Sequence, residues 1–296
     1  MKTFEERLQE KTRAAEAAVR NYLPEESGFQ KNLIEASNYS VLAGGKRLRP
    51  LIMQAVYEAF GGIGAGVEPF MAGLEMIHSS SLVHDDLPCM DNDEYRRGKL
   101  TTWKKYGYDM AVLAGDDLLV EAFAAASHAM ELGIRPELVV KGMRVLAQKA
   151  GIFGMIGGQS VDVELTGKEV LPDQLDFINR LKTGALLEAA MMIGCILAGG
   201  SEEEVKEMEI IASRIGVAFQ IRDDILDVTS TTEILGKPVN SDEKNQKNTY
   251  VFLHGIQEAE QKVEEYSGEA RERLAKVLPN DTFLIQLVEW LIHREK

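Results

Sequence analysis

Apolar residues recur at intervals of three and four along most of the chain, which is the spacing of amphipathic α-helices. The pattern predicts helices at Phe4–Tyr22, Leu33–Leu42, Leu51–Phe60, Phe70–Val83, Met110–Met130, Leu138–Ala150, Leu175–Ala198, Glu202–Val228, Val251–Val277 and Phe283–Ile292. No segment alternates apolar and polar residues between turn signals, so no β-strand is expected. Prolines and glycine pairs such as Gly157-Gly158 interrupt the helices, and no low-complexity linker divides the chain. We therefore predict an all-α fold of about ten helices in a single domain over residues 1–296.

Composition and charge narrow the possible functions. Hydrophobic residues make up 45% of the 296 residues, which is enough for a large core. The net charge of −14 argues against a general nucleic-acid-binding protein and against a polybasic membrane-surface protein. Cys89 and Cys195 are too few for a disulfide framework and lie in no metal-binding motif. The N-terminus has no apolar segment typical of a signal peptide, and the longest apolar run, Ala189–Gly200, is too short to cross a bilayer. A cytoplasmic protein without stable membrane association is expected.

A first cluster of aspartates, Asp85, Asp86 and Asp91, follows a strongly apolar segment. Pro88 should end the preceding helix near Leu87 and let the chain turn, because proline cannot continue a helix. The turn is expected to bring Asp91 back toward the first two aspartates.

A second cluster, Asp223, Asp224 and Asp227, also follows an apolar segment. Asp223 and Asp227 are four residues apart and should share one helical face. Carboxylates gathered in this way repel each other unless a cation lies among them, and Mg²⁺ prefers carboxylate, water and phosphate oxygens. A solvated acidic face is the competing interpretation, but the position of both clusters next to apolar helices disfavours it. The sequence therefore predicts Mg²⁺ sites.

Basic residues alternate with the two aspartate clusters along the chain. Gly44-Gly45 precedes Lys46, Arg47 and Arg49, just before a helix expected to begin near Pro50. Further basic residues are Arg96, Arg97, Lys99, Lys182, Lys237 and Lys247. A helix N-terminus combined with Lys and Arg side chains is suited to binding a diphosphate. The combination of acidic and basic groups indicates recognition of a Mg²⁺–diphosphate beside an apolar helical interior.

These motifs resemble those of the trans-isoprenyl diphosphate synthases. The resemblance rests on GGKRLRP, EMIHSSSLVHDDLPCMDNDEYRRGK, LAGDDLL, LKTG, FQIRDDILD, LGKP and NTY, in this order, from Tyr39 to Tyr250. The four residues between Asp86 and Asp91 resemble the short-chain bacterial and plastid type, the farnesyl and geranylgeranyl diphosphate synthases. The resemblance implies an isoprenoid-synthase-type helical bundle with a cavity between the two aspartate clusters. It also implies a homodimeric prenyltransferase of isoprenoid biosynthesis.

The resemblance further implies a role for each matching residue. Asp85, Asp86, Asp91, Asp223, Asp224 and Asp227 would bind Mg²⁺, about three ions when diphosphate is bound. Lys46, Arg49, His78 and Arg97 would bind isopentenyl diphosphate. Arg96, Lys182, Thr183, Gln220, Lys237 and Lys247 would bind the allylic diphosphate. The expected catalytic residues, which stabilise the departing pyrophosphate, are Asp85, Asp91, Asp223, Lys182 and Arg96. Three departures from the family pattern stand out. Trp103 stands where relatives often have His, Ser241 replaces the usual second lysine after Lys237, and Glu94-Tyr95 replaces a more usual Asp-Leu pair before Arg96.

The product length depends on the turns before the first aspartates. Relatives that stop at the fifteen-carbon product commonly carry an aromatic residue five positions before Asp85, where this chain has Ser80. Ser80 and Ser81 are small and leave no floor beneath the growing product. Ile77 one turn deeper, or side chains of residues 120–124 on a facing helix, can close the pocket instead. We predict farnesyl diphosphate as the main product, with geranylgeranyl diphosphate as the alternative.

Three other functions are weighed against this one. An HD-type metal phosphohydrolase could use His78, His84 and Asp85, but this leaves GGKRLRP and the second aspartate cluster unexplained. A class I terpene cyclase would share the first cluster but normally carries an Asn/Ser/Glu-type second metal motif. A non-catalytic partner subunit typically lacks one aspartate motif, and both are present here.

Overall fold

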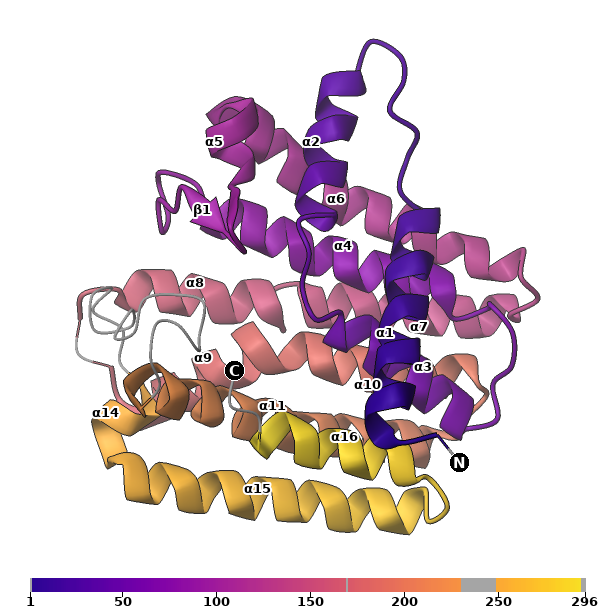
Figure 1. Ribbon diagram of the computed structural model, residues 1–296, viewed down its shortest axis with the longest axis vertical. Helices are drawn as coiled ribbons and strands as arrows, with labels where there is room; N and C mark the ends of the chain where they lie inside the picture. Colours follow the sequence, from indigo (N-terminus) through magenta and orange to yellow (C-terminus); the bar gives the residue numbers. More distant parts are fainter. Residues whose placement is uncertain (1, 169, 230–248, 294–296) are drawn as a thin grey trace. The chain divides into compact units, whose positions relative to one another are not determined.

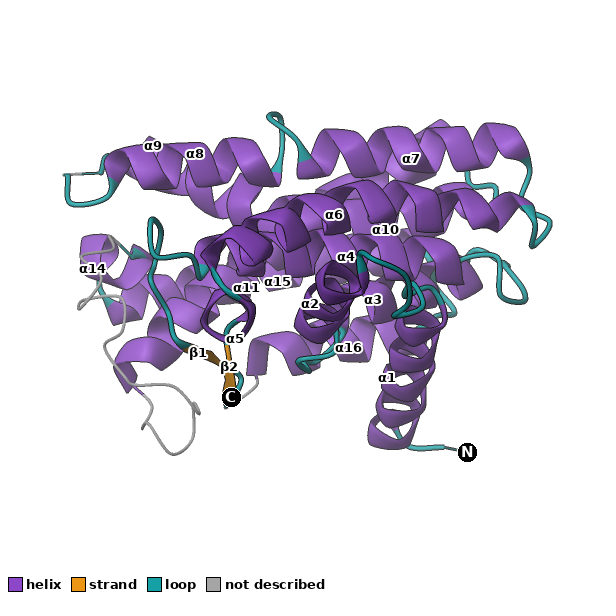
Figure 2. Ribbon diagram, turned by 90° about the horizontal axis from the view of Figure 1, so that it is seen from above, coloured by secondary structure: helices purple, strands orange, loops and turns teal. Residues whose placement is uncertain are grey.

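The computed structural model describes residues 2–168, 170–229 and 249–293, which form two compact units with their boundary after residue 143 (Figure 1). Helices make up nearly all of the regular structure in both units, as colouring by secondary structure shows (Figure 2). The predicted all-α fold class is therefore confirmed. The single domain over residues 1–296 and the cavity expected between the aspartate clusters stay predictions.

The N-terminal unit is built around helices α4 and α6. Its elements are α1 (Phe4–Asn21), α2 (Lys31–Val41), α3 (Leu48–Ala59), α4 (Glu68–Asp85), β1 (Tyr95–Arg96), β2 (Lys99–Leu100), α5 (Thr102–Tyr106), α6 (Tyr108–Ser127) and the 3₁₀ turn η1 (His128–Met130). Helix α7 (Pro136–Ala150) contains the boundary between the units. Helices α1 and α3 pack against α4, and α2 contacts both α4 and α6.

Glycines allow α4 and α6 to pack closely. A Cβ atom added to Gly73 on α4 would lie 2.5 Å from the carbonyl oxygen of Ala122 on α6. Nearer the end of α4, the ring of His84 occupies the space that a side chain on Gly115 would need, and His84 Nε2 lies 3.2 Å from the Val112 carbonyl oxygen. This tight contact fixes the position of the C-terminal end of α4, where the first aspartate cluster begins.

The C-terminal unit is built around the long helix α11. Its elements are α8 (Met155–Leu165), α9 (Pro172–Ile178), the π-helical turn η2 (Asn179–Gly184), α10 (Ala185–Leu197), α11 (Glu202–Thr229), α14 (Tyr250–His254), α15 (Ile256–Val277) and α16 (Thr282–His293). Helices α10, α15 and α16 pack against α11. Almost every residue of α10 is buried, which agrees with its composition of Ala, Leu, Met and Ile.

Helix α8 was missed because Gly157-Gly158 was interpreted as an interruption. The glycine pair lies inside the helix, and a Cβ atom on Gly158 would overlap the backbone nitrogen of Lys182 in η2. The glycine therefore permits a close helix contact. The predicted helix Leu175–Ala198 is present as α9, η2 and α10, with a π-helical turn in its middle.

The expected absence of strands is wrong at one short hairpin. The two-residue strands β1 and β2 pair antiparallel, Tyr95 with Leu100 and Arg96 with Lys99. The turn residues Arg97 and Gly98 have φ angles of 53° and 74°. Positive φ at both central positions is the geometry of a type I′ hairpin turn. The sequence signal was weak because Arg replaces the usual Asn or Asp.

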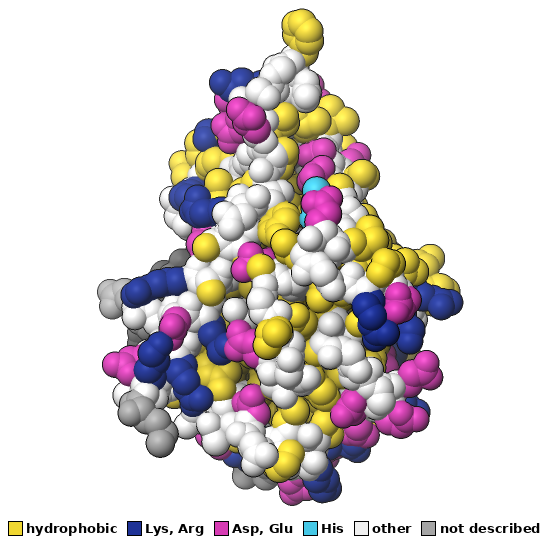
Figure 3. Space-filling model, turned by 90° about the vertical axis from the view of Figure 1, so that its right-hand side faces the viewer, with side chains coloured by type: hydrophobic (Ala, Val, Ile, Leu, Met, Phe, Trp, Pro, Cys, Tyr) yellow, Lys and Arg dark blue, Asp and Glu magenta, His cyan; other side chains and the backbone are white. Residues whose placement is uncertain are grey.

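No helix within the described ranges is long and apolar enough to span a membrane. On the surface face shown in Figure 3, basic side chains form small groups separated by acidic and apolar ones.

Candidate active site

The first aspartate motif forms the turn that the sequence predicts. Helix α4 ends at Asp85, and the backbone N–H of Asp91 donates to the Asp85 carbonyl oxygen over 2.9 Å. The N–H of Asn92 donates to the Leu87 carbonyl oxygen over 3.1 Å, which closes the loop. Asp85 is half-buried and Asp91 is exposed. The loop therefore returns Asp91 to the end of α4, as expected from Pro88.

Asp86 is directed at Arg96 rather than toward solvent. It is 3% exposed, and it accepts hydrogen bonds from Arg96 Nε at 2.8 Å and Nη2 at 2.6 Å. Burial raises the pKa of the Asp86 carboxyl, and the Arg96 guanidinium opposes this rise without cancelling it. Asp86 thus positions Arg96, one of the predicted ligands of the allylic diphosphate.

The glycine pair before Lys46 shapes a loop that Arg97 crosses. Gly44 and Gly45 have φ angles of 106° and 131°, which residues with a side chain rarely adopt. A Cβ atom on Gly45 would lie 2.7 Å from the Arg97 guanidinium, and Arg97 donates a hydrogen bond to the Gly44 carbonyl oxygen. Lys46 itself is exposed. The hairpin and the loop before α3 are therefore brought together.

Arg49, His78 and Arg97 form a basic cluster in the N-terminal unit. Burial and then the nearby arginines Arg49, Arg97, Arg96 and Arg47 lower the pKa of His78 well below its usual range, so this imidazole is neutral near pH 7. Burial lowers the pKa of Arg49, and the charge of Arg97 lowers it further. Cations that lower each other's pKa values are stabilised by a bound anion. Three of the four predicted isopentenyl diphosphate ligands thus lie together.

The second aspartate motif is embedded in a hydrogen-bonded chain. Asp224 is 4% exposed, and it accepts hydrogen bonds from Gln220 Nε2 at 3.0 Å and from the Tyr250 backbone N–H at 2.9 Å. Gln220 Oε1 in turn accepts from the Thr183 hydroxyl at 3.0 Å. Asp223 is half-buried and Asp227 is buried on the same helix. The structure therefore joins Thr183, Gln220 and Asp224, three predicted site residues.

Lys182 is held by a residue that the sequence analysis missed. Its Nζ lies 2.6 Å from Oδ2 of Asp162 on α8. Lys182 and Thr183 belong to the π-helical turn η2, a geometry often found at functional sites. Asp162 was missed because the glycine pair Gly157-Gly158 was interpreted as a helix interruption, so no helix was predicted for the segment that carries Asp162. Lys237, Lys247 and Ser241 lie outside the described residues.

Comparison with known proteins places these residues in a family. The family model described as polyprenyl synthetase matches residues 30–279. The chain belongs to the polyprenyl synthetase family. It is 46% identical over 245 residues to geranylgeranyl pyrophosphate synthase 3, chloroplastic, of Arabidopsis thaliana, covering 81% of this chain and 68% of that protein. It is 41% identical over 261 residues to farnesyl diphosphate synthase of Geobacillus stearothermophilus, covering 88% of each.

A solved structure extends the match. The geranyltransferase of Helicobacter pylori superposes with a TM-score of 0.85 at 30% identity, covering 99% of this chain and 97% of that one. This polyprenyl synthetase is thus a prenyltransferase of the short-chain trans-isoprenyl diphosphate synthase type, and it elongates prenyl chains. The finding sets aside the HD-type phosphohydrolase. It also fits the packing of His84, which lies against α6 beside Gly115.

The carboxylates of this polyprenyl synthetase fit Mg²⁺ that also binds a diphosphate. No three Asp, Glu, His or Cys side chains within the described ranges form a metal site by themselves. Asp85 with Asp91, and Asp223 with Asp227, nevertheless supply carboxylate oxygens, which Mg²⁺ prefers. Because Mg²⁺ usually keeps waters and shares phosphate oxygens, one or two carboxylates suffice for a site that a diphosphate completes.

The predicted chain-length residues lie in the packed part of α4. Ser80 is 1% exposed, Ile77 is fully buried, and the Ser81 hydroxyl donates to the His78 carbonyl oxygen over 2.8 Å. Ser80 lies seven residues after Gly73 and four before His84, both of which face α6. Helical spacing therefore places Ser80 on the face of α4 that packs against α6. Its role in product length stays a prediction.

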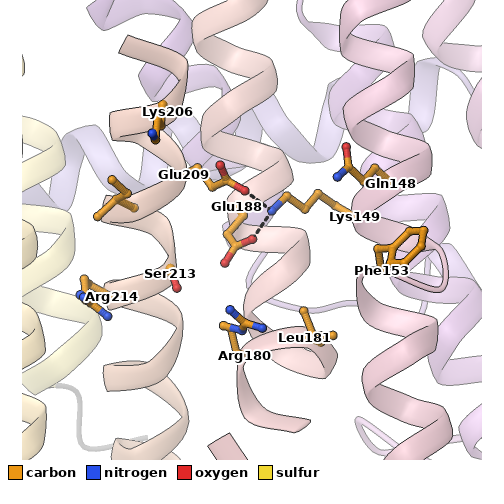
Figure 4. Close-up of a pocket in the computed structure, with 11 residues that line it drawn as sticks. Gln148, Lys149, Phe153, Arg180, Leu181, Glu188, Lys206, Glu209, Ser213 and Arg214 are labelled. Atoms are coloured by element: carbon orange, nitrogen blue, oxygen red, sulfur yellow. Dashed lines mark hydrogen bonds and ion pairs between the residues drawn. The ribbon is translucent and has the colours of Figure 1, made fainter. Parts of the chain in front are cut away.

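A separate cavity of about 430 Å³ lies in the C-terminal unit (Figure 4). Lys149 reaches between Glu188 and Glu209, with its Nζ 2.6 Å from Glu209 Oε1 and in contact with the Glu188 carboxylate. Arg180 and Leu181 of η2 also line the cavity, directly before Lys182. The predicted substrate ligands are not among its lining residues within the described ranges.

Proposed function

We propose that this chain condenses isopentenyl diphosphate with dimethylallyl and then geranyl diphosphate, in the presence of Mg²⁺, to give farnesyl diphosphate and pyrophosphate. The observation that carries the proposal is the basic cluster of Arg49, His78 and Arg97, in which Arg97 donates a hydrogen bond to the Gly44 carbonyl oxygen in the loop before Lys46. The neighbouring Arg96 pairs with Asp86 of the first aspartate motif. A terpene cyclase or a hydrolase acts on one diphosphate, whereas a condensing enzyme must hold a second diphosphate as well.

Different residues of the chain bind the two substrates. Arg96 and Lys182 donate hydrogen bonds to the allylic diphosphate and stabilise the negative charge that grows on the departing pyrophosphate. Bound Mg²⁺ ions on the aspartates would neutralise further charge on that leaving group. The H. pylori geranyltransferase structure, which is described as complexed with magnesium and isoprenyl diphosphate, supports this assignment.

The second substrate is held so that its double bond meets the allylic carbon. Arg49, Arg97 and Lys46 bind its diphosphate by charge, and neutral His78 donates an N–H hydrogen bond. Apolar helix faces exclude water from the allylic cation. The proton lost from the isopentenyl unit passes to the departing pyrophosphate, so no side-chain base is needed.

Pyrophosphate release from geranyl diphosphate tests the reaction. With Mg²⁺, release should require isopentenyl diphosphate, and chromatography should detect a fifteen-carbon product. Release without isopentenyl diphosphate would indicate a cyclase or a hydrolase. The absence of release with both substrates would favour a non-catalytic partner subunit.

Product length needs a test of its own, because the chain is similar both to a relative named as a farnesyl diphosphate synthase and to one named as a geranylgeranyl pyrophosphate synthase. Ser80→Phe should suppress any twenty-carbon product and leave the steps to fifteen carbons working. Ser80→Ala serves as the control, since it changes little volume. Because Ser80 is buried against α6, thermal melting must show that Ser80→Phe still folds. An unchanged distribution of products in a wild-type enzyme that makes twenty-carbon chains would place the floor elsewhere.

A homodimer in the cytoplasm completes the proposal. Leu113 and Val120, seven residues apart on α6, are exposed, and so are Ile152, Phe153 and Ile156 in the C-terminal unit. Groups of exposed apolar side chains are typical of surfaces that another chain covers. Size-exclusion chromatography with light scattering should give twice the mass of 32.8 kDa, and a monomer would contradict the assignment.

A further inference from the structure

Arg47 is the centre of a buried ion-pair network in the N-terminal unit. It is 2% exposed, although it follows the exposed Lys46. Its Nη1 donates to Glu75 Oε1 over 2.6 Å, its Nε donates to Glu16 Oε2 over 2.5 Å, and its Nη2 donates to the Val41 carbonyl oxygen over 2.6 Å. The guanidinium therefore ties together α1, α4 and the C-terminal end of α2.

The backbone of Arg47 has an unusual conformation. Its φ and ψ angles are 50° and 34°, in the left-handed region that few residues other than glycine, Asn and Asp adopt. Arg47 is also the N-cap residue of α3. Such a conformation persists only when surrounding contacts stabilise it. The contacts of the guanidinium supply that stabilisation at the point where the chain turns into α3.

We propose that Arg47 is a positioning residue for isopentenyl diphosphate and does not itself contact the diphosphate. Held by Glu16, Glu75 and the Val41 carbonyl group, it sets the directions in which Lys46 and Arg49 leave the backbone on either side. The inference rests on the proposed function of those two residues.

An arginine suits this position better than a lysine. The three acceptors lie on α1, α4 and α2, and a planar guanidinium can donate to all of them at once in fixed directions. A lysine ammonium carries the same charge on a flexible stem without the fixed fork of donors. The network therefore depends on the shape of Arg47 as well as on its charge.

The direction in which the affinity for isopentenyl diphosphate changes distinguishes a positioning role from a purely electrostatic one. Burial opposes the charge of Arg47, but Glu16 and Glu75 together raise the pKa of Arg47 above its usual value. Glu75 also opposes the lowering of the pKa values of Arg49 and Arg97 by burial. Removing a carboxylate from this network makes the surroundings of the basic cluster more positive, so electrostatics alone predicts tighter binding of a diphosphate. Loss of positioning predicts weaker binding. Glu16 is the better site for the test because it lies at the edge of the network, and its side chain is 31% exposed.

The experiment compares Glu16→Gln with Glu58→Gln in steady-state kinetics with both substrates varied separately. Glu58 pairs with Lys11 and also joins α3 to α1, but at the other end of α3. We expect Glu16→Gln to raise KM for isopentenyl diphosphate about tenfold, while kcat and KM for geranyl diphosphate change less than about twofold. We expect Glu58→Gln to behave like the wild type. An unchanged or lowered KM for isopentenyl diphosphate in Glu16→Gln would overturn the inference.

Arg47→Lys provides the second variant. A positioning role predicts a rise in KM for isopentenyl diphosphate of about the same size as in Glu16→Gln. A direct contact with the diphosphate predicts a raised KM in Arg47→Lys together with a wild-type KM in Glu16→Gln, and this result would contradict the inference. Thermal melting checks that each variant folds, and if Arg47→Lys unfolds, Glu16→Gln decides alone. A wild-type enzyme that does not condense the two substrates would instead contradict the proposed function.

Discussion

In both aspartate motifs, one in each unit, the second aspartate is more buried than the first. Asp86 and Asp224, the second aspartates, are buried and accept hydrogen bonds from the protein. Asp85 and Asp223, the first aspartates, are half-buried at the ends of the same apolar segments. The hydrogen bonds of the second aspartates therefore help to shape each motif. Mg²⁺ binding by the first aspartates stays a prediction.

The two motifs differ in what the buried aspartate holds. Asp86 pairs with a charged guanidinium, that of Arg96, whereas Asp224 accepts from the neutral amide of Gln220 and from the backbone N–H of Tyr250. Loss of charge at Asp86 would leave Arg96 with the more distant carboxylate of Asp93, 3.7 Å from its Nη2. Loss of charge at Asp224 would weaken its hydrogen bonds from Gln220 and Tyr250. The first motif should therefore be more sensitive to neutralisation of its second aspartate.

The largest effect is expected from Asp85→Ala and Asp223→Ala. Each should lower kcat by about a thousandfold or more, because charge neutralisation of the departing pyrophosphate is lost. The fold should survive, since removal of one carboxylate relieves repulsion within its motif. Steady-state kinetics and thermal melting of both variants measure these quantities. Activity within about tenfold of the wild type would show that the metal assignment is wrong.

Gly158→Ala tests how the C-terminal unit positions Lys182. Because the added Cβ atom would overlap the Lys182 backbone, we expect a loss of about 2 kcal/mol in the free energy of unfolding, with lower activity. Gly268→Ala is the control, since its Cβ atom on α15 would meet no atom within 4 Å. The control should be more stable by about 0.5 kcal/mol. Equal behaviour of the two variants in urea denaturation would argue against the close contact.

Asp86→Asn and Asp224→Asn address the difference between the motifs directly. We expect Asp86→Asn to lower the free energy of unfolding by about 2 kcal/mol, because Arg96 loses its buried counter-ion. Asp224→Asn should lower it by about 1 kcal/mol, because the amide oxygen can still accept one hydrogen bond. Urea denaturation provides the measurement. A larger effect at Asp224 would reverse the comparison.

The smallest effect concerns pH and His78, in the basic cluster with Arg49 and Arg97. The folded protein holds the pKa of His78 well below its usual value of 6.5, so below that pH the unfolded chain binds a proton that the folded protein does not. Stability must therefore fall as the pH decreases below 6.5, by at most about 1.4 kcal/mol per pH unit from this residue. In His78→Gln the decline between about pH 7 and about pH 5 should be shallower. Parallel stability curves would contradict a neutral His78.

The sequence predicted those features that depend on local pattern. The long helices follow from apolar periodicity, and the return of Asp91 to Asp85 follows from Pro88. Helix α8 was missed because the same Gly157-Gly158 pair that marks an interruption locally is needed inside the helix for a close contact with η2. The close contact becomes visible only in the structure, where η2 packs against α8.

Glu75 and Asp162 were missed for a related reason. Each takes its role from a basic residue distant in sequence, Glu75 from Arg47 and Asp162 from Lys182. In an acidic protein a single carboxylate on an apolar helix carries no local signal of this pairing. The grouping of Arg49, His78 and Arg97 was predicted from a resemblance, whereas the neutral state of His78 follows from its burial among arginines.

The π-helical turn η2 has a consequence for how this chain tolerates insertions and deletions. A π-helical turn holds one residue more than an α-helical turn, so deleting one residue within Asn179–Gly184 would restore regular helix geometry. With one residue fewer the turn would still complete about the same rotation, so α10 would keep its orientation relative to α9 and its side chains would stay buried. Within the turn, Lys182 and Thr183 would change direction relative to their partners Asp162 and Gln220. A change of one residue in length would therefore separate folding from catalysis.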